Sequence, residues 1–123
     1  MATIVIVCSD LMLQSRVLEG AHRAGYETAL ADTADELSRA LDRGAALVAL
    51  DLHAPGLDWR AAAALARERS VPVLAFGRHT EASLLREARD AGCDLVVARS
   101  ALVEDLPALI ARLVGKAGIL QPE

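Results

Sequence analysis

Short apolar runs alternate with amphipathic segments along the whole chain. Residues 3–8 read TIVIVC and residues 46–50 read ALVAL, and both runs are continuous and too short for helices. Runs of this kind predict strands that are buried on both faces of a parallel sheet. Further strands are expected over residues 27–31, which are weaker and nearer an edge, over 71–76 and over 94–98.

Helical periodicity and helix-end signals fill the intervals between these strands. Apolar positions at helical spacing predict a helix over residues 11–24, with Gly25 as its C-terminal cap. Thr33 and Glu36 have the spacing of a capping box, which opens a helix that runs to about Arg43. Three more helices are expected over residues 59–69, from residue 80 or 81 to residue 91, and over residues 103–114.

Five strand–helix units in strict alternation predict an α/β fold. Right-handed crossovers place helices on both faces of a parallel sheet. In a chain of this length, five strands favour the flavodoxin-like (βα)5 three-layer sandwich with sheet order 2-1-3-4-5. We assign residues 1–115 to this domain and residues 116–123 to a C-terminal tail or linker. Functional residues are expected at the carboxyl ends of the strands, where such sheets bind ligands.

Composition and charge narrow the setting of this domain. The hydrophobic fraction of 54% argues against disorder, and the net charge of −4 argues against nucleic-acid binding. No run reaches the roughly 18 apolar residues of a membrane span. Cys8 and Cys93 lie far apart without C-x-x-C spacing, which predicts two buried thiols and a cytoplasmic setting, rather than a disulfide framework or a zinc site.

The stretch DLHAPGLDW, residues 51–59, supports three interpretations. Asp51 ends the third strand and could accept a phosphoryl group. Alternatively, Asp51, His53 and Gly56 form the D-x-H-x-x-G pattern of cobalamin-binding domains, with His53 as the cobalt ligand. The third interpretation is a turn without chemistry.

The position of the motif weakens the cobalamin interpretation. Ser100 and Leu102 also fit the S-x-L of such domains, but the histidine motif follows the third strand instead of the first. No Gly-Gly pair is present for the nucleotide tail, and only about twenty residues follow Ser100. A small-molecule-binding module of this kind is kept as an alternative.

The chain resembles the receiver domains of bacterial response regulators over about residues 3–114. The segment D51-L-H-A-P-G-L-D58-W is similar to the family's D-x-x-M-P-x-M-D-G, with both aspartates and the proline in register. Similar family segments occur at A24-G25-Y26, V71-P72-V73 and A91-G92-C93-D94-L95. The resemblance implies two-component signalling, with Asp51 at the phosphoacceptor position, a histidine kinase as phosphodonor and no enzyme activity.

The chemistry-bearing positions of the family match less well. The acidic pair that holds magnesium in receivers falls on Cys8 and Ser9, with Asp10 one residue beyond. The family's Ser/Thr falls on Gly77, and its lysine falls on Arg99. Magnesium prefers oxygen ligands and carboxylate charge. The resemblance therefore implies a degenerate acidic pocket.

We expect a pseudo-receiver that acts by phosphorylation-independent binding to a protein partner or output domain. No cofactor is expected. Magnesium would bind only to a phosphorylatable domain, held by Asp10, Asp51 and the backbone of His53. An ion pair between Asp51 and Arg99 would take the place of the metal, because an unpaired buried charge is costly. The alternative is that both side chains face water.

In receivers, the fourth helix, fifth strand and fifth helix commonly bind partners. The corresponding residues here are Leu84, Leu85, Arg89, Val96, Leu102 and Leu106, several of which must also serve the core. A second copy of the chain is a further candidate partner, whereas nucleic acid and membrane are not expected. The alternative function is a working receiver in which Asp51 accepts phosphate from a histidine kinase.

Overall fold

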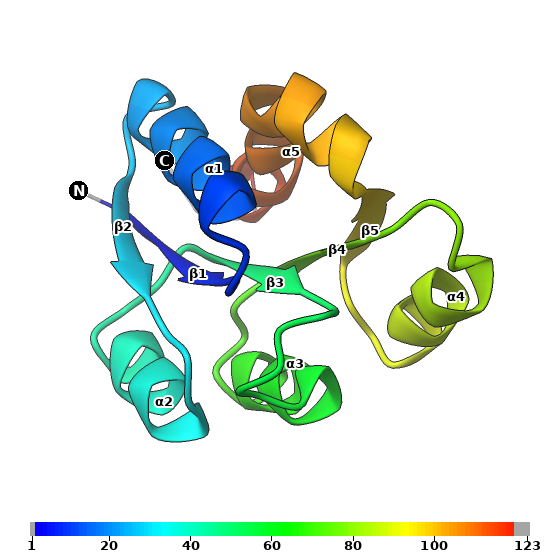
Figure 1. Ribbon diagram of the computed structural model, residues 1–123. Coiled ribbons are helices and arrows are strands. Elements are labelled where there is room, and N and C mark those ends of the chain that lie inside the picture. Colours follow the sequence, from blue (N-terminus) through cyan, green and yellow to red (C-terminus); the bar gives the residue numbers. More distant parts are fainter. Residues whose placement is uncertain (1, 120–123) are drawn as a thin grey trace.

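A parallel sheet in the order β2-β1-β3-β4-β5 forms the centre of the structure (Figure 1). The computed structural model describes residues 2–119, and the side chains of residues 2–114. The strands are β1 (Thr3–Val7), β2 (Glu27–Leu30), β3 (Leu47–Asp51), β4 (Val73–Gly77) and β5 (Leu95–Ala98). The helices are α1 (Leu11–Arg23), α2 (Ala34–Asp42), α3 (Trp59–Glu68), α4 (Ala82–Asp90) and α5 (Arg99–Ile119). The predicted flavodoxin-like topology is confirmed.

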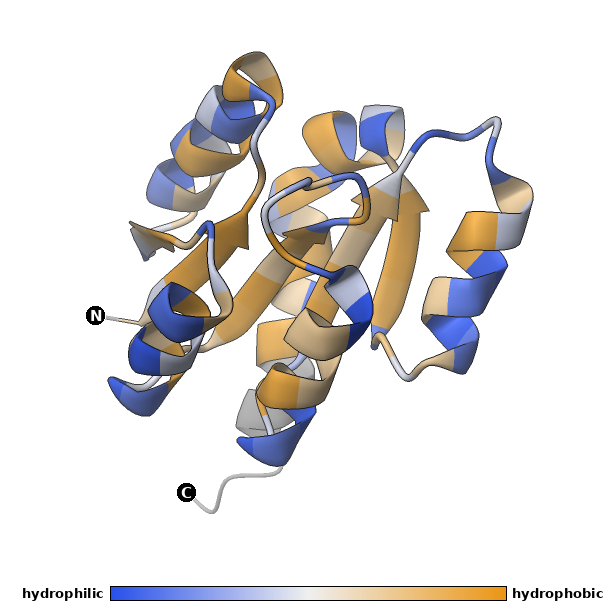
Figure 2. Cartoon of the chain, turned by 60° about the horizontal axis from the view of Figure 1, so that its bottom comes forward, coloured by the Kyte–Doolittle hydropathy of each residue, from blue (hydrophilic) through white to orange (hydrophobic). Residues whose placement is uncertain are grey.

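Helices cover the sheet on both faces. α1 and α5 lie on one face, and α2, α3 and α4 lie on the other (Figure 1). In β1, Val5 and Val7 pack toward the second group of helices, whereas Ile4 and Ile6 pack toward the first. This two-sided burial explains why the inner strands are continuous apolar runs. Figure 2 accordingly shows mainly hydrophobic strands, whereas hydrophobic and hydrophilic residues alternate along the helices.

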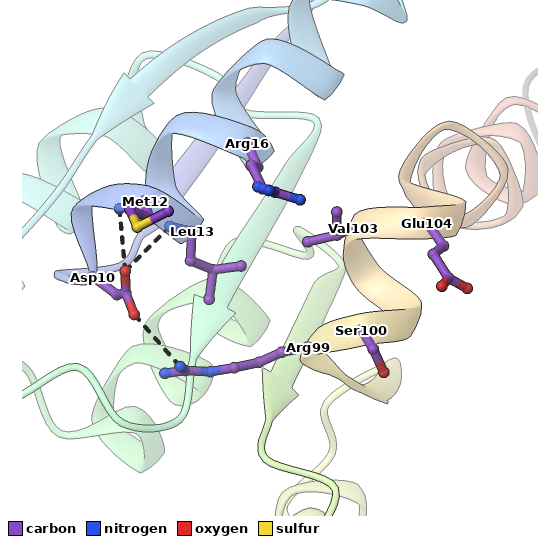
Figure 3. Close-up of a pocket in the computed structure, with 8 residues that line it drawn as sticks. All are labelled: Asp10, Met12, Leu13, Arg16, Arg99, Ser100, Val103 and Glu104. Carbon is purple, nitrogen blue, oxygen red and sulfur yellow. Dashed lines mark hydrogen bonds and ion pairs between the residues drawn. The ribbon is translucent and has the colours of Figure 1, made fainter.

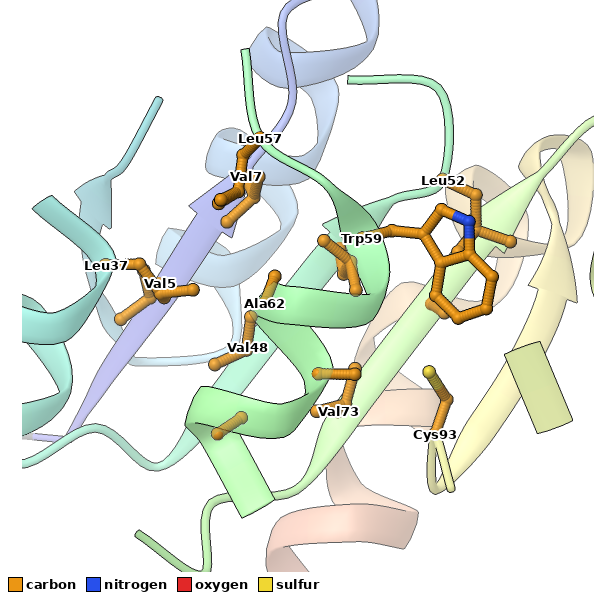
Figure 4. Packing of buried hydrophobic residues seen from close by; sticks show 14 of the residues in the cluster. Val5, Val7, Leu37, Val48, Leu52, Leu57, Trp59, Ala62, Val73 and Cys93 are labelled. Atoms are coloured by element: carbon orange, nitrogen blue, oxygen red, sulfur yellow. The ribbon is translucent and has the colours of Figure 1, made fainter. Parts of the chain in front are cut away.

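Trp59 is the largest side chain in the core between the sheet and α2–α4. The residue is 8% exposed, and its ring lies beside Leu52 and Cys93 (Figure 4). Outside the core, the guanidinium of Arg60 covers the ring at 4.3 Å from its centroid and also pairs with Glu87 of α4. The cation–π contact lies within α3, and the ion pair with Glu87 links α3 to α4 across the outer surface.

Side-chain caps begin three of the helices. Asp10 caps α1, Thr33 caps α2 and Asp58 caps α3. In α2, the Thr33 hydroxyl accepts the N–H of Glu36 at 3.1 Å, as a capping box requires. The return bond differs from the prediction, because the Glu36 carboxylate accepts the N–H of Asp32 at 2.8 Å instead of the N–H of Thr33.

The last helix begins earlier than predicted. α5 starts at Arg99, directly after β5, and Asp105 interrupts it with non-helical angles of φ −115° and ψ 17°. Pro107 follows in the first turn of the second piece, where its missing N–H leaves no hydrogen bond unmade. The predicted helix over residues 103–114 therefore starts late, inside the first piece of α5.

The expected C-terminal tail is partly helical. Residues 116–119 continue α5, and residues 120–123 lie outside the described residues. Within the described chain, no helix combines the length and apolarity that crossing a membrane requires.

Candidate functional site

Asp51 is the buried charged residue at the carboxyl end of β3, with 2% of its surface exposed. Its Oδ1 accepts the backbone N–H of His53 at 2.9 Å. Its Oδ2 lies 3.5 Å from Nη2 of Arg99 and accepts the thiol of Cys8 at 3.6 Å. Both oxygens are therefore engaged within the protein, as a buried carboxylate requires.

Arg99 places a positive charge between two carboxylates. From the first position of α5, its Nη1 lies 3.6 Å from Oδ2 of Asp10, and its Nη2 lies 3.5 Å from Oδ2 of Asp51 (Figure 3 shows the contact with Asp10). The predicted Asp51–Arg99 ion pair is confirmed, since its distance is below the usual limit of about 4 Å. The share that Asp10 takes in it was not predicted.

Asp10 is held in place by its role as the cap of α1. Its Oδ1 accepts the N–H groups of Met12 and Leu13 at 3.1 and 3.2 Å (Figure 3). Only its second oxygen faces Arg99. A metal ion near Asp51 could therefore reach only the Oδ2 atom of Asp10, because Oδ1 caps α1. Oδ2 is already paired with the guanidinium of Arg99.

Cys8 contributes a protonated thiol to this pocket. The side chain is 1% exposed, so the predicted burial is confirmed. Burial, and after it the negative charge of Asp51, together raise the pKa of the Cys8 thiol from 9.0 to about 12. The thiol thus keeps its proton near neutral pH and can donate it to Asp51. The contact between Cys8 and Asp51 follows from the register of β1 and β3. Val7 pairs with Leu50, so the residues that follow them, Cys8 and Asp51, lie beside each other.

Gly77 ends β4 in an apolar surrounding. A Cβ atom at this position would lie 3.2 Å from Cδ2 of Leu85 and 3.4 Å from Cδ1 of Leu52. At this position, where receivers carry a Ser or Thr hydroxyl, the surrounding space is therefore lined by leucine methyl groups. Ser9 lies elsewhere, since it lines a neighbouring hollow of about 280 Å³ together with Gln14 and other residues.

A contact that the sequence did not predict joins His53 to Glu81. Nε2 of His53 lies 2.8 Å from Oε1 of Glu81, an ion pair when the imidazole is protonated. Glu81 is the N-cap residue of α4 but makes no side-chain capping bond. The contact ties the β3–α3 loop to α4. No local sequence signal connects the two residues, because only the packing of α4 on the sheet brings them together.

The D-x-H-x-x-G residues have structural roles in this arrangement. For His53 to bind cobalt through Nε2, its contact with Glu81 would have to break. At Gly56, a Cβ atom would lie 2.9 Å from the backbone oxygen of Asp32, so the glycine permits close backbone packing. These contacts account for the motif without a cobalamin.

Most of the predicted interaction face is core. The buried members are Leu85, Val96, Leu102 and Leu106, with exposures of 9%, 6%, 0% and 3%. They are buried because the apolar sides of α4 and α5 face the sheet, and β5 lies beneath them. Leu84 is half-buried and Arg89 is exposed, so these two remain at the surface. That the face binds a partner stays a prediction.

As they are arranged, the side chains of the pocket offer few ligands to magnesium. Among the residues that the structure describes, no group of three or more His, Cys, Asp and Glu residues is placed to hold a metal ion. The space between Asp10 and Asp51 already faces the charged nitrogens of Arg99. A second cation there would experience direct repulsion.

Comparison with known proteins identifies the fold. No protein-family model matches the chain, and no curated protein matches it by sequence. Among solved structures, a response regulator receiver domain protein from Clostridium thermocellum matches with a TM-score of 0.81 and 16% identity, covering 98% of this chain and 100% of that one. The receiver domain of NtrX from Brucella abortus matches with a TM-score of 0.80 and 22% identity, covering 91% and 98%. The chain has the receiver-domain fold.

A third match shows the same fold with a metal. The receiver domain of the sensor histidine kinase PA1611 from Pseudomonas aeruginosa, with magnesium in its active site cleft, has a TM-score of 0.75 and 21% identity and covers 93% and 98%. The predicted resemblance to receiver domains is thus confirmed for the fold. In the receiver-domain fold of this chain, Asp51 and Arg99 meet at the carboxyl edge of the sheet, where the sequence placed them.

Proposed function

We propose that this chain is a pseudo-receiver that takes part in signal transduction through phosphorylation-independent protein–protein interaction. The observation that carries the proposal is the guanidinium of Arg99, which lies within 3.6 Å of both Asp10 and Asp51. An internal cation balances the carboxylates of the pocket without a dissolved metal. The net charge of the pocket is thereby the same whether or not a metal ion is present in solution.

Phosphoryl transfer depends on positioning and on cations that neutralise the developing charge. Here Oδ2 of Asp51 is engaged by Arg99 and the Cys8 thiol, and Oδ1 accepts the N–H of His53. An incoming phosphoryl group would have to displace these contacts. It would also meet the apolar wall of Leu52 and Leu85 beside Gly77. Both features support a pocket without efficient phosphoryl chemistry and a domain that performs no turnover of its own.

Binding to a protein partner or an output domain would then provide the function. Leu84 and Arg89 are the members of the expected face that lie at the surface of α4. Cys8 and Cys93 are free thiols, which suits a protein of the reducing cytoplasm.

A working receiver is the second candidate. Its support is the position of Asp51 at the end of β3 in a fold that a magnesium-bound receiver domain shares. In this case a histidine kinase would phosphorylate Asp51. A dissolved magnesium ion would first have to displace Arg99 from the two carboxylates.

One experiment separates the two candidates. The protein is incubated with magnesium chloride and either acetyl phosphate or beryllofluoride, and its intact mass and its amide NMR spectrum are recorded. We expect no phosphoryl adduct and no change in the amide signals around Asp51. The variant Asp51→Asn serves as the control for modification elsewhere. An adduct on the wild-type protein that this variant lacks would establish the working receiver and overturn the proposal.

A further inference from the structure

The outer surface between α1 and α5 is hollowed along the length of α1. Two hollows of about 480 and 500 Å³ lie there and share three lining residues, Arg16, Val103 and Glu104. The first hollow reaches Asp10 and Arg99, and the second reaches Arg23 and Pro107. We call this continuous surface the α1–α5 groove, and Figure 3 shows its first half.

Close packing of the two helices shapes the floor of the groove. Leu106 of α5 lies directly over Gly20 of α1, where a Cβ atom would lie 2.5 Å from Cδ2 of Leu106. Because Gly20 has no side chain, Leu106 packs directly against the backbone of α1 at this point. The largely buried side chains of Leu13 and Leu106 line the first and the second hollow, respectively, and the lining of the first hollow is mainly apolar.

Two large apolar side chains project beside the groove. Leu11 and Met12, in the first turn of α1, are 75% and 74% exposed. Met12 lines the first hollow, opposite Val103 of α5 (Figure 3). Single exposed hydrophobic residues are normal, but these two are adjacent and lie next to a hollow with a mainly apolar lining. The surface thus has both a projection and a recess.

Opposite charges line the two walls of the groove. Arg16 belongs to α1 and Glu104 belongs to α5, and among the described residues neither makes a hydrogen bond or ion pair. Arg23, farther along α1, is instead paired with Glu19 at 3.2 Å. Arg16 and Glu104 are therefore available to a partner that presents the opposite charge to each wall.

We propose that the α1–α5 groove binds a second copy of this chain. A two-fold interface uses the same surface on both subunits and must be complementary to itself. This groove meets that condition, since it carries an apolar projection and a recess, and one unpaired charge of each sign. In the dimer, Met12 of each copy enters the groove of the other, and Arg16 of each copy pairs with Glu104 of the other. The surface of α4 with Leu84 and Arg89 stays free for a different partner.

Charge reversal with rescue tests this interface. Sedimentation velocity is measured from low to high micromolar concentrations on the wild type, Met12→Glu, Arg16→Glu, Glu104→Arg and the double variant Arg16→Glu/Glu104→Arg. The control is Arg86→Glu, which reverses an exposed charge on α4. We expect a reversible wild-type dimer that each single variant of the groove weakens, by about three- to tenfold for the charge reversals. The double variant restores the affinity because both pairs re-form with exchanged signs, and the control leaves it unchanged.

Several outcomes would overturn the proposal. A wild-type protein that stays monomeric at the highest concentration has no such interface. If Met12→Glu, Arg16→Glu and Glu104→Arg leave the dimer affinity unchanged, the dimer uses another surface. If Arg86→Glu weakens the dimer as much as the groove variants do, the affinity depends on the total charge of the protein and not on this groove. Circular dichroism of each variant verifies that loss of the dimer is not loss of the fold. The result is independent of the pocket chemistry, because Asp51→Asn changes no residue of the groove and should leave the dimer intact.

Discussion

Asp51 and Arg99 show how far single residues can be placed from sequence. Their meeting was predictable because the carboxyl ends of parallel strands share one edge of the sheet. The part played by Asp10 was not, because it depends on which of its two oxygens caps α1. The contact between His53 and Glu81 was also beyond sequence reasoning, since it depends on where α4 settles against the sheet.

At the residue scale, we predict that stability falls at alkaline pH because of Cys8. The pKa of its thiol is about 12 in the folded protein and near 9.0 in the unfolded chain. Above pH 9 the unfolded chain has lost this proton and the folded protein keeps it, so the free energy of unfolding decreases with pH. The slope approaches about 1.4 kcal/mol per pH unit for one such group. Urea unfolding of the wild type and Cys8→Ala between pH 8 and the folded pKa measures the difference.

Cys93 sets the background for this experiment. Burial also raises the pKa of its thiol, to about 11, so both proteins should be compared with Cys93 replaced by alanine. The slope should then be flatter when Cys8 is absent. Equal slopes in the two proteins would show that the Cys8 thiol titrates alike in the folded and unfolded states.

At the scale of elements, helix ends follow local signals where these exist. Thr33 and Gly25 were placed correctly, because a hydroxyl cap and a glycine at positive φ act over a single turn. The start of α5 was placed too late because Arg99 follows β5 directly, so that no loop or cap signal separates the strand from the helix. The sequence indicated that several residues of the expected docking face also serve the core, and Leu102 and Leu106 are two of these buried residues.

The cap of α2 gives a prediction at this scale. Thr33→Ala removes the acceptor for the N–H of Glu36 and should lower the free energy of unfolding by about 1 kcal/mol. Thr33→Ser keeps the hydroxyl and should retain most of that stability. Chemical denaturation measures the loss, and hydrogen exchange should place its largest effect in the first turn of α2. Equal losses in both variants would assign the effect to the lost methyl group instead of the cap.

At the scale of the whole molecule, the alternation of strands and helices determined the sheet order, and the sheet order determined where the site lies. The sequence also predicted a degenerate pocket, from Ser9, Gly77 and Arg99, and this stays a prediction. It could not show how the space beside Gly77 is filled, because Leu52 and Leu85 reach it from two different elements.

The response to magnesium is the prediction for the molecule as a whole. The melting temperature of the wild type should be the same in millimolar magnesium chloride as in sodium chloride of equal ionic strength. Arg99→Ala removes the cation between Asp10 and Asp51 and should gain a magnesium-specific stabilisation, about 2.7 kcal/mol at a hundred times the dissociation constant. Differential scanning calorimetry measures both.

Two further variants control this response. Asp51→Asn combined with Arg99→Ala should abolish the gain, since one of the two carboxylates is lost. Arg89→Ala, at the surface of α4, should behave as the wild type. If magnesium stabilises the wild type, the metal displaces the Arg99 side chain from Asp10 and Asp51.

Arg99 is attached to the chain, and this has a consequence for how such a domain could be controlled. A tethered ion has a fixed local concentration that neither dilution nor a chelator can change. The electrostatic balance of the pocket would therefore be the same in starved and well-fed cells, whatever their ion content. Within the proposed function, a signal would then reach such a domain through its binding partner or its abundance, and not through the ions of the pocket.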